Sequence, residues 1–304
     1  MSFVSDLING ADNKFDHTSL NALQKVTLRA VVMAFLFYGL AAIEGMIMRT
    51  ASVIPSIPPV YGSPEHYFSI MTVHPIVGIF GSTYQLVFGA FMFLVPFLTK
   101  KPLYSVKLAN WVWLLITVGT ALSWIAAFAW NYAPLYTLYW PLPADTEQFK
   151  TIGGIVFILG VALIMLGTFG FIYNIYATIF ARVGAHQNKT MKELLISGFG
   201  IDGILNLWYK LTGRQPYTKE PALSLPVVAI FRGTVDTFLD ALIILGAGIL
   251  VLVYLFADLG GFNLDVKSVD ALLYKNWFWW GLDLVADGLV LIYVAGSWYL
   301  LATI

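Results

Sequence analysis

A single histidine, His74, lies inside a long apolar stretch of the sequence. Residues 67–99 contain no Lys, Arg, Asp or Glu. Roughly 20 apolar residues are enough to cross the hydrocarbon core of a bilayer. A polar side chain at such a position is costly without a partner, so it is a candidate for a functional site. Imidazole is the side chain that most often binds metals in proteins. The alternative is a core histidine that is satisfied by an internal hydrogen bond.

Carboxylates also occur inside apolar stretches near the C-terminus. Arg232, Asp236 and Asp240 are spaced four residues apart, so they share one face of a helix, and Asp283 and Asp287 do the same. A helix rises about 1.5 Å per residue, and on that scale Asp240 matches Asp283 in depth while Asp236 matches Asp287. If the two helices face each other, four carboxylates gather with one arginine.

Such a cluster would need compensation for its negative charge. The carboxylates could share protons, bind a cation or meet arginines from another chain. In the alternative reading, Arg232 pairs with Asp236, and the other carboxylates face water or a partner subunit. The sequence therefore predicts proton or cation candidates here and leaves these alternatives open.

The composition indicates which elements must position these side chains. The chain has 304 residues, of which 59% are hydrophobic and 11% charged. Soluble domains carry about 25% charged residues, so this is a membrane protein. The apolar runs are continuous rather than alternating, which indicates helices and not a barrel. We predict an all-α, single membrane domain over residues 1–304. The predicted spans are residues 25–47, 68–98, 107–131, 152–182, 226–257 and 277–303, with a loop at 183–225.

Basic residues indicate the orientation of these six helices. Lys25 and Arg29 precede the first span, three lysines occupy residues 100–107, and six more bases lie in residues 182–219. The alternate loops are mostly acidic. By the positive-inside rule, both termini are cytoplasmic. The first 24 residues are polar, so no cleavable signal peptide is predicted.

Two local features affect how the helices are built. Pro75 follows His74 directly and cannot donate a backbone hydrogen bond, so the helix should either start late or kink there. Residues 191–211 alternate apolar and polar groups, and they could lie on the membrane surface or form a glycine-broken loop.

The sequence also excludes several kinds of site. It contains no cysteine, which excludes disulfides, thiolate-bound copper and iron–sulfur clusters. It has no glycine-rich phosphate loop before a helix, and no basic and aromatic patch that would indicate nucleic acid.

The stretch around His74 resembles a known family. HYFSIMTVHPIVGIFGSTYQLVFGAFMFLVP, residues 66–96, is similar to the second helix of subunit I of haem–copper oxidases. In that family a Thr-x-His unit precedes a long apolar helix that ends in Leu-Val-Pro, and its histidine is an axial ligand of the low-spin haem. Thr72 and His74 match this unit, whereas Pro75 stands where the family usually has glycine. The resemblance implies that His74 binds haem iron.

Further motifs follow in the family's order. LYTLYWPLP at residues 135–143 resembles the aromatic loop after helix three, and KNWFWW at residues 275–280 resembles the start of helix six. Arg49 matches an arginine that lies near the low-spin haem, although an arginine that anchors the membrane surface would also fit. The likeness is greatest to B-type oxidases and covers helices one to six, the N-terminal half of a typical subunit I.

Helix six departs from the family. The family has a copper-binding histidine there and, in many members, a tyrosine cross-linked to it. Asp283 takes the histidine position and Asp287 the tyrosine position, so this chain presents no copper ligand. The other copper ligands, the high-spin haem ligand and the second low-spin ligand belong to helices seven to twelve. Catalytic residues are therefore not assigned, and the chain is not expected to reduce oxygen alone.

The resemblance implies a split or degenerate subunit I of a respiratory terminal-oxidase complex in a prokaryotic cell membrane. A second membrane polypeptide would supply the remaining helices and the opposite ligand of a shared low-spin haem. Other respiratory subunits and lipid would be further partners, with no nucleic acid. The chain would relay electrons and protons. The alternatives are a non-catalytic scaffold that keeps the oxidase fold, and a proton- or cation-conducting unit that uses the intramembrane aspartates.

Overall fold

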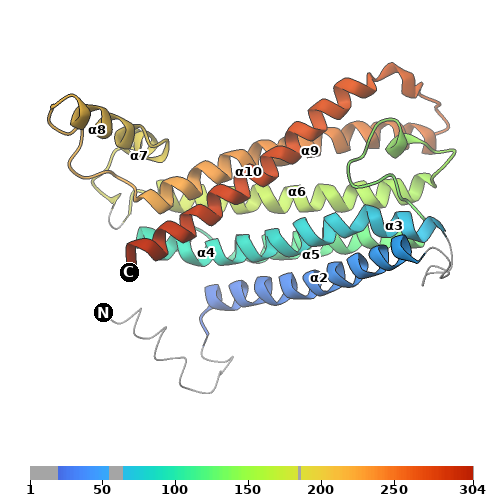
Figure 1. Cartoon of the computed structure of the whole chain (residues 1–304), viewed down its shortest axis with the longest axis horizontal. Helices are drawn as coiled ribbons and strands as arrows, with labels where there is room; N and C mark the ends of the chain where they lie inside the picture. The colour runs from blue at the N-terminus through green and yellow to red at the C-terminus, as the bar shows by residue number, and fades with distance from the viewer. Residues whose placement is uncertain (1–19, 55–63, 184–185, 304) are drawn as a thin grey trace.

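The described part of the chain is a bundle of long helices that run side by side (Figure 1). A computed structural model describes residues 20–54, 64–183 and 186–303. Its long helices are α2 (Ala22–Val53), α3 (Pro64–Pro75) continued by η1 (Ile76–Tyr84) and α4 (Gln85–Thr99), α5 (Val106–Ala129), α6 (Thr151–Phe180), α9 (Leu225–Leu259) and α10 (Ala271–Thr303). The predicted all-α membrane fold is confirmed.

Five of these helical segments are long and apolar enough to cross a membrane. They are Ala22–Val53, His66–Thr99, Val106–Ala129, Thr151–Phe180 and Leu225–Leu259. They correspond to the first five predicted spans, and the first extends beyond its predicted end at residue 47. The sixth predicted span falls in α10, which packs along α9 (Figure 1). That α10 crosses the membrane remains a prediction, as does the orientation of the bundle.

The helices pack in an order that follows the chain. α2 lies against η1 and α4, α5 against α6, α6 against α9, and α9 against α10. α5 and α6 approach closely at Gly119 and Gly160. A Cβ atom added to Gly160 would lie 2.7 Å from the Gly119 carbonyl oxygen and would also collide with the Ser123 Oγ. Small residues let membrane helices approach closely enough for backbone atoms to touch.

Pro75 neither ends the second long helix nor delays its start. α3 continues through Pro75 into η1, a π-helix of nine residues, and then into α4. A proline cannot donate the normal backbone hydrogen bond, and a π-helix shifts the bonding pattern by one residue. Thr83 adds a bond of the same reach, since its hydroxyl donates to the Gly78 carbonyl at 3.1 Å. The predicted late start is therefore wrong, because α3 begins before Pro75, and the predicted kink stays a prediction.

Lys101 is one of the loop lysines that indicate the membrane orientation. In the structure its buried side chain caps the C-terminal end of α6. Its side chain is 4% exposed. The Nζ atom donates to the carbonyls of Thr178, Ile179 and Ala181 at 3.3, 2.7 and 2.7 Å. The last carbonyls of a helix have no partner within it, and a cation is favourable at that end. Lys101 therefore joins the loop after α4 to the end of α6.

Replacing Lys101 by methionine should destabilise the protein. The substitution keeps most of the aliphatic side chain but removes the donor for three carbonyls. Hydrogen bonds to a charged group are worth roughly 1.5–3 kcal/mol, so we expect a loss of that order in the free energy of unfolding. Thermal unfolding in detergent measures the effect. Lys100→Met is the matched control, because Lys100 is exposed. Equal stability of the two variants would contradict the capping role.

The segment between α6 and α9 contains two short helices, α7 (Met191–Gly198) and α8 (Ile201–Leu211). Gly200 lies between them at φ +72°, so the segment combines helix with a glycine break. The outward face of α8 is apolar: Ile204, Trp208 and Leu211 are 66%, 57% and 74% exposed. This face fits the expected surface helix, whose contact with lipid remains a prediction.

Candidate functional site

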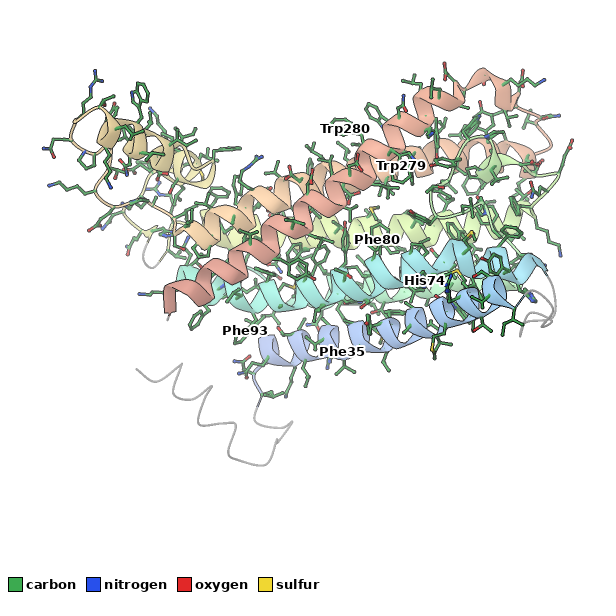
Figure 2. All side chains as sticks on the ribbon, in the orientation of Figure 1. Phe35, His74, Phe80, Phe93, Trp279 and Trp280 are labelled. Atoms are coloured by element: carbon green, nitrogen blue, oxygen red, sulfur yellow. The ribbon has the colours of Figure 1, made fainter. Side chains whose placement is uncertain are left out.

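His74 lies in the last turn of α3, close to α2, and away from the end of the bundle that carries α7 and α8 (Figure 2). Its Nδ1 atom is 3.9 Å from Oε2 of Glu44 on α2. The imidazole side chain is 34% exposed and the Glu44 side chain 4% exposed. Nδ1 itself is buried, so the exposed part of the side chain comprises its other atoms. The imidazole thus turns one nitrogen toward a carboxylate and leaves Nε2 for another partner.

Glu44 is held from its other side by α5. The Trp124 Nε1 atom donates to Glu44 Oε1 at 2.8 Å. Glu44 Oε2 and His74 Nδ1 are both buried and have no hydrogen-bond partner. Buried polar atoms of folded proteins almost always have partners, so such a facing pair marks a strained or functional position. Three helices therefore meet at this carboxylate.

Thr72, the first residue of the Thr-x-His unit, connects this region to the loop after α5. Its hydroxyl donates to the Phe68 carbonyl at 2.8 Å and accepts a hydrogen bond from the Leu135 backbone N–H at 3.1 Å. The side chain is fully buried. Thr72 therefore fixes the start of the aromatic loop against α3, two residues before His74.

His74 and its neighbour Glu44 have the arrangement expected of an axial haem ligand and the group that orients it. A metal-bound histidine usually directs its second ring nitrogen to a carboxylate, carbonyl or water. The orphaned pair of His74 Nδ1 and Glu44 Oε2 has this arrangement, with Nε2 left for iron. Within the described ranges, no group of three or more His, Cys, Asp or Glu side chains is placed to hold a metal ion. His74 as a haem ligand therefore stays a prediction, which the arrangement of its ring nitrogens fits.

Arg49 lies on α2, five residues after Glu44, and its side chain is exposed. No described carboxylate lies within ion-pair distance of it, since the one such contact in the described residues is that of His74 and Glu44. This position is compatible with both of its predicted roles, at a haem or at the membrane surface.

The intramembrane aspartates do not come together as one cluster in the described structure. Asp240 is fully buried, and its Oδ2 accepts a hydrogen bond from the Tyr84 hydroxyl at 2.8 Å. Asp236 is half-buried, in electrostatic range of Arg232 and Asp287. Asp283 and Asp287 are exposed on α10. The four carboxylates are therefore divided. Asp240 is buried and bonded to Tyr84, whereas Asp236, Asp283 and Asp287 lie nearer the surface.

Arg232 makes no contact ion pair with Asp236. Among the described residues, no N–O distance of 4.0 Å or less joins Arg232 to a carboxylate. Its effect on Asp236 is electrostatic only. The ion pair between Arg232 and Asp236, one of the alternatives predicted from the sequence, is therefore not formed.

Three residues of these sites were not assigned from the sequence: Glu44, Trp124 and Tyr84. A signal existed for Glu44, because a carboxylate inside the first apolar span is itself a candidate for function. Trp124 and Tyr84 have no such signal among the many aromatic residues of the chain. Their roles depend on which helix faces which, and that information comes only from the bundle.

Comparison with known proteins places this geometry in a family. The family model of cytochrome c and quinol oxidase polypeptide I matches residues 25–304. The chain belongs to this family. The resemblance to subunit I of haem–copper oxidases is thereby confirmed, and the protein is a multi-pass membrane protein.

Several bacterial proteins are similar to this chain. The cytochrome c oxidase subunit 1 homolog of Agrobacterium tumefaciens is 30% identical over 176 residues, which is 50% of this chain and 28% of the relative. Cytochrome c oxidase subunit 1 of Rhodobacter capsulatus is 29% identical over 182 residues, 54% of this chain and 30% of the relative. The bacteroid homolog of Bradyrhizobium diazoefficiens is 31% identical over 173 residues, 52% and 28%. The chain thus spans less than a third of the length of the relatives it matches.

Proposed function

We propose that this chain is a split or degenerate subunit I of a respiratory terminal-oxidase complex, in which His74 is an axial ligand of a low-spin haem. The observation that carries the proposal is the His74 imidazole, whose Nδ1 faces a buried carboxylate at 3.9 Å. When bound, the haem would supply one-electron redox chemistry. The chain's own residues would bind it, orient its ligand and keep water from the ligand's inner face.

The remaining parts of the complex are proposed to come from a second membrane polypeptide. Among the described residues no group of three or more His, Cys, Asp or Glu side chains could hold a metal ion, and we assign the opposite ligand to that partner. Asp283 and Asp287 replace the helix-six copper ligand and its tyrosine, and the proposal therefore places no copper ligand in this chain. Other respiratory subunits and lipid would cover the exposed faces, such as the outer face of α2 at Phe35, which is 65% exposed.

The visible spectrum of the purified complex, with and without His74, tests the haem assignment. Purification under mild conditions tests the partner. We expect a further membrane chain that carries paired histidines to co-purify with this one. A complex that contains haem but no second chain with a histidine ligand would contradict the split-subunit proposal.

Asp240 is the best placed of the aspartates to carry a proton. It is fully buried, Tyr84 donates to its Oδ2, and its Oδ1 has no partner. A buried carboxylate with one free oxygen can gain and lose a proton there, while its other oxygen keeps the hydrogen bond from the tyrosine hydroxyl. The other candidates are less buried and would pass protons toward Asp240 and Tyr84. They are Asp236, Asp283 and Asp287.

Replacing Asp240 by asparagine should slow proton uptake by the complex. The amide keeps the shape and can still accept from Tyr84, but it cannot exchange a proton. Loss of a positioned proton carrier costs on the order of 100-fold in rate. Proton uptake in proteoliposomes during turnover measures the effect. The control is Asp258→Asn, an exposed carboxylate at the end of α9. Unchanged proton uptake in Asp240→Asn would assign Asp240 a structural role.

Two other functions remain as alternatives. The replaced copper ligand at Asp283 favours a non-catalytic scaffold that keeps the oxidase fold, and the buried Asp240 favours a proton- or cation-conducting unit. Haem content of the purified complex separates the first proposal from both. Electrogenic flux through haem-free proteoliposomes would favour the conducting unit over the scaffold.

A further inference from the structure

We infer that Glu44 is a positioning residue that holds the His74 imidazole through a hydrogen bond from Nδ1–H, while Trp124 fixes its other oxygen. The inference rests on the proposed function, because it assigns His74 Nε2 to the iron. It adds a carboxylate from α2 to a site that was recognised from α3 alone.

The three side chains form a chain of contacts across three helices. Trp124 on α5 donates to Glu44 Oε1 at 2.8 Å, and Glu44 Oε2 faces His74 Nδ1 at 3.9 Å. The second distance is too long for a hydrogen bond, whose usual limit is about 3.2 Å. Both atoms are buried and lack any other partner. A small movement of the imidazole toward Glu44 would satisfy both atoms at once, with Glu44 kept in place by Trp124.

The backbone of α2 also limits where the imidazole can lie. A Cβ atom added to Gly45 would be 3.3 Å from His74 Cε1 and 4.0 Å from Nε2. The absence of a side chain at Gly45 therefore leaves room for the ring edge that carries Nε2. Consecutive residues of α2 thus lie beside neighbouring atoms of the ring, Glu44 beside Nδ1 and Gly45 beside Cε1.

The carboxylate has a chemical consequence as well as a steric one. A carboxylate that accepts a hydrogen bond from the distal ring nitrogen fixes the tautomer and makes the imidazole a stronger electron donor. Negative charge near the ligand favours the oxidised, more positive form of the iron. Glu44 is therefore expected to lower the reduction potential of the bound group, which a purely structural residue would not do.

Glu44→Gln in the purified complex tests this role. The amide keeps the size of the side chain but removes the charge. We expect haem to be retained and the ratio of reduced to oxidised haem, at a fixed solution potential, to rise about tenfold. For a one-electron couple that change corresponds to about 59 mV. Redox titration followed at the low-spin absorbance band measures the ratio. The low-spin electron paramagnetic resonance spectrum should also change, since it reports the orientation of the imidazole.

Glu193→Gln is the matched control. It makes the same chemical change on α7, at the other end of the bundle, where Glu193 caps the helix through Thr190. We expect no shift of the potential in this variant. An unshifted potential in Glu44→Gln, or an equal shift in both variants, would overturn the inference.

Glu44→Asp is the second variant and decides the question if Glu44→Gln does not assemble. It keeps the charge but withdraws it from the ring by one methylene, so we expect a shift of the same sign and smaller size. An unchanged potential and spectrum would overturn the role of Glu44. His74→Ala separates the two levels of the argument. If that variant keeps the full low-spin spectrum, the proposed function fails; if it loses the spectrum while the Glu44 variants are unshifted, only the role of Glu44 fails.

Discussion

Replacing His74 by alanine should abolish the low-spin haem spectrum of the complex. The substitution removes the imidazole whose Nδ1 faces Glu44 and whose Nε2 is assigned to haem iron. It also leaves Glu44 Oε2 buried with nothing to face. Loss of an axial ligand is more severe than loss of the groups around it, which typically costs 10–100-fold in affinity. We therefore expect haem content to fall by about 100-fold or more. Absorbance of the purified complex and extraction of its haem measure the loss.

His66→Ala is the control for this experiment. His66 lies on the same helix, and its ring contacts Phe128 at a centroid distance of 6.2 Å. We expect this variant to keep its low-spin haem. A full low-spin spectrum in His74→Ala, or an equal loss in both variants, would remove His74 from the site and favour the scaffold or the conducting unit.

Replacing Gly160 by alanine should separate α5 from α6 and destabilise the whole bundle. The added Cβ would lie 2.7 Å from the Gly119 carbonyl oxygen and 2.8 Å from the Ser123 backbone nitrogen. These are backbone atoms, so no side-chain rotation relieves the contact. Overpacking usually costs about 1–3 kcal/mol, and we expect the upper end of this range or more. Thermal unfolding in detergent measures the loss.

Gly160→Ala should also disturb the candidate site around His74. Ser123 is followed on α5 by Trp124, which donates to Glu44. A shift of α5 would therefore move the group that fixes the Glu44 carboxylate. Gly246→Ala is the control, because no atom lies within 4 Å of a Cβ at that position of α9. Alanine is the better helix former, so we expect this control to be neutral or slightly stabilising. Equal stability of Gly160→Ala and Gly246→Ala would contradict the close contact of α5 and α6.

The helices could be predicted from the sequence because hydropathy acts over many residues at once. Runs without charge, such as residues 67–99, must be helical in a bilayer, since every backbone polar group needs a partner there. The path through Pro75 could not be predicted in the same way. A proline permits an end, a kink or a π-helix, and these alternatives differ by contacts with the neighbouring helices. Lys101 likewise appeared to be an ordinary loop charge until the end of α6 was placed beside it.

The candidate site was predicted in part. His74 was found from its motif and its apolar surroundings, and Asp240 from its position inside a span. Their partners, Glu44 and Tyr84, lie on other helices far away in the sequence. Apolar periodicity is weak in helices that are apolar on all sides, so the sequence does not indicate which way each one faces. The sequence could therefore not indicate that Asp240 pairs with Tyr84 rather than with Asp283.

The π-helix of residues 76–84 affects how this chain is compared with its relatives. His74 lies before this segment and faces α2, whereas Tyr84 lies at its end and reaches Asp240 on α9. One residue of an α-helix corresponds to a turn of about 100°. An alignment that carries an unbroken α-helix through this region would keep His74 in register but rotate every later position to a different neighbour. Residue correspondences with the family are therefore to be drawn separately on the two sides of η1.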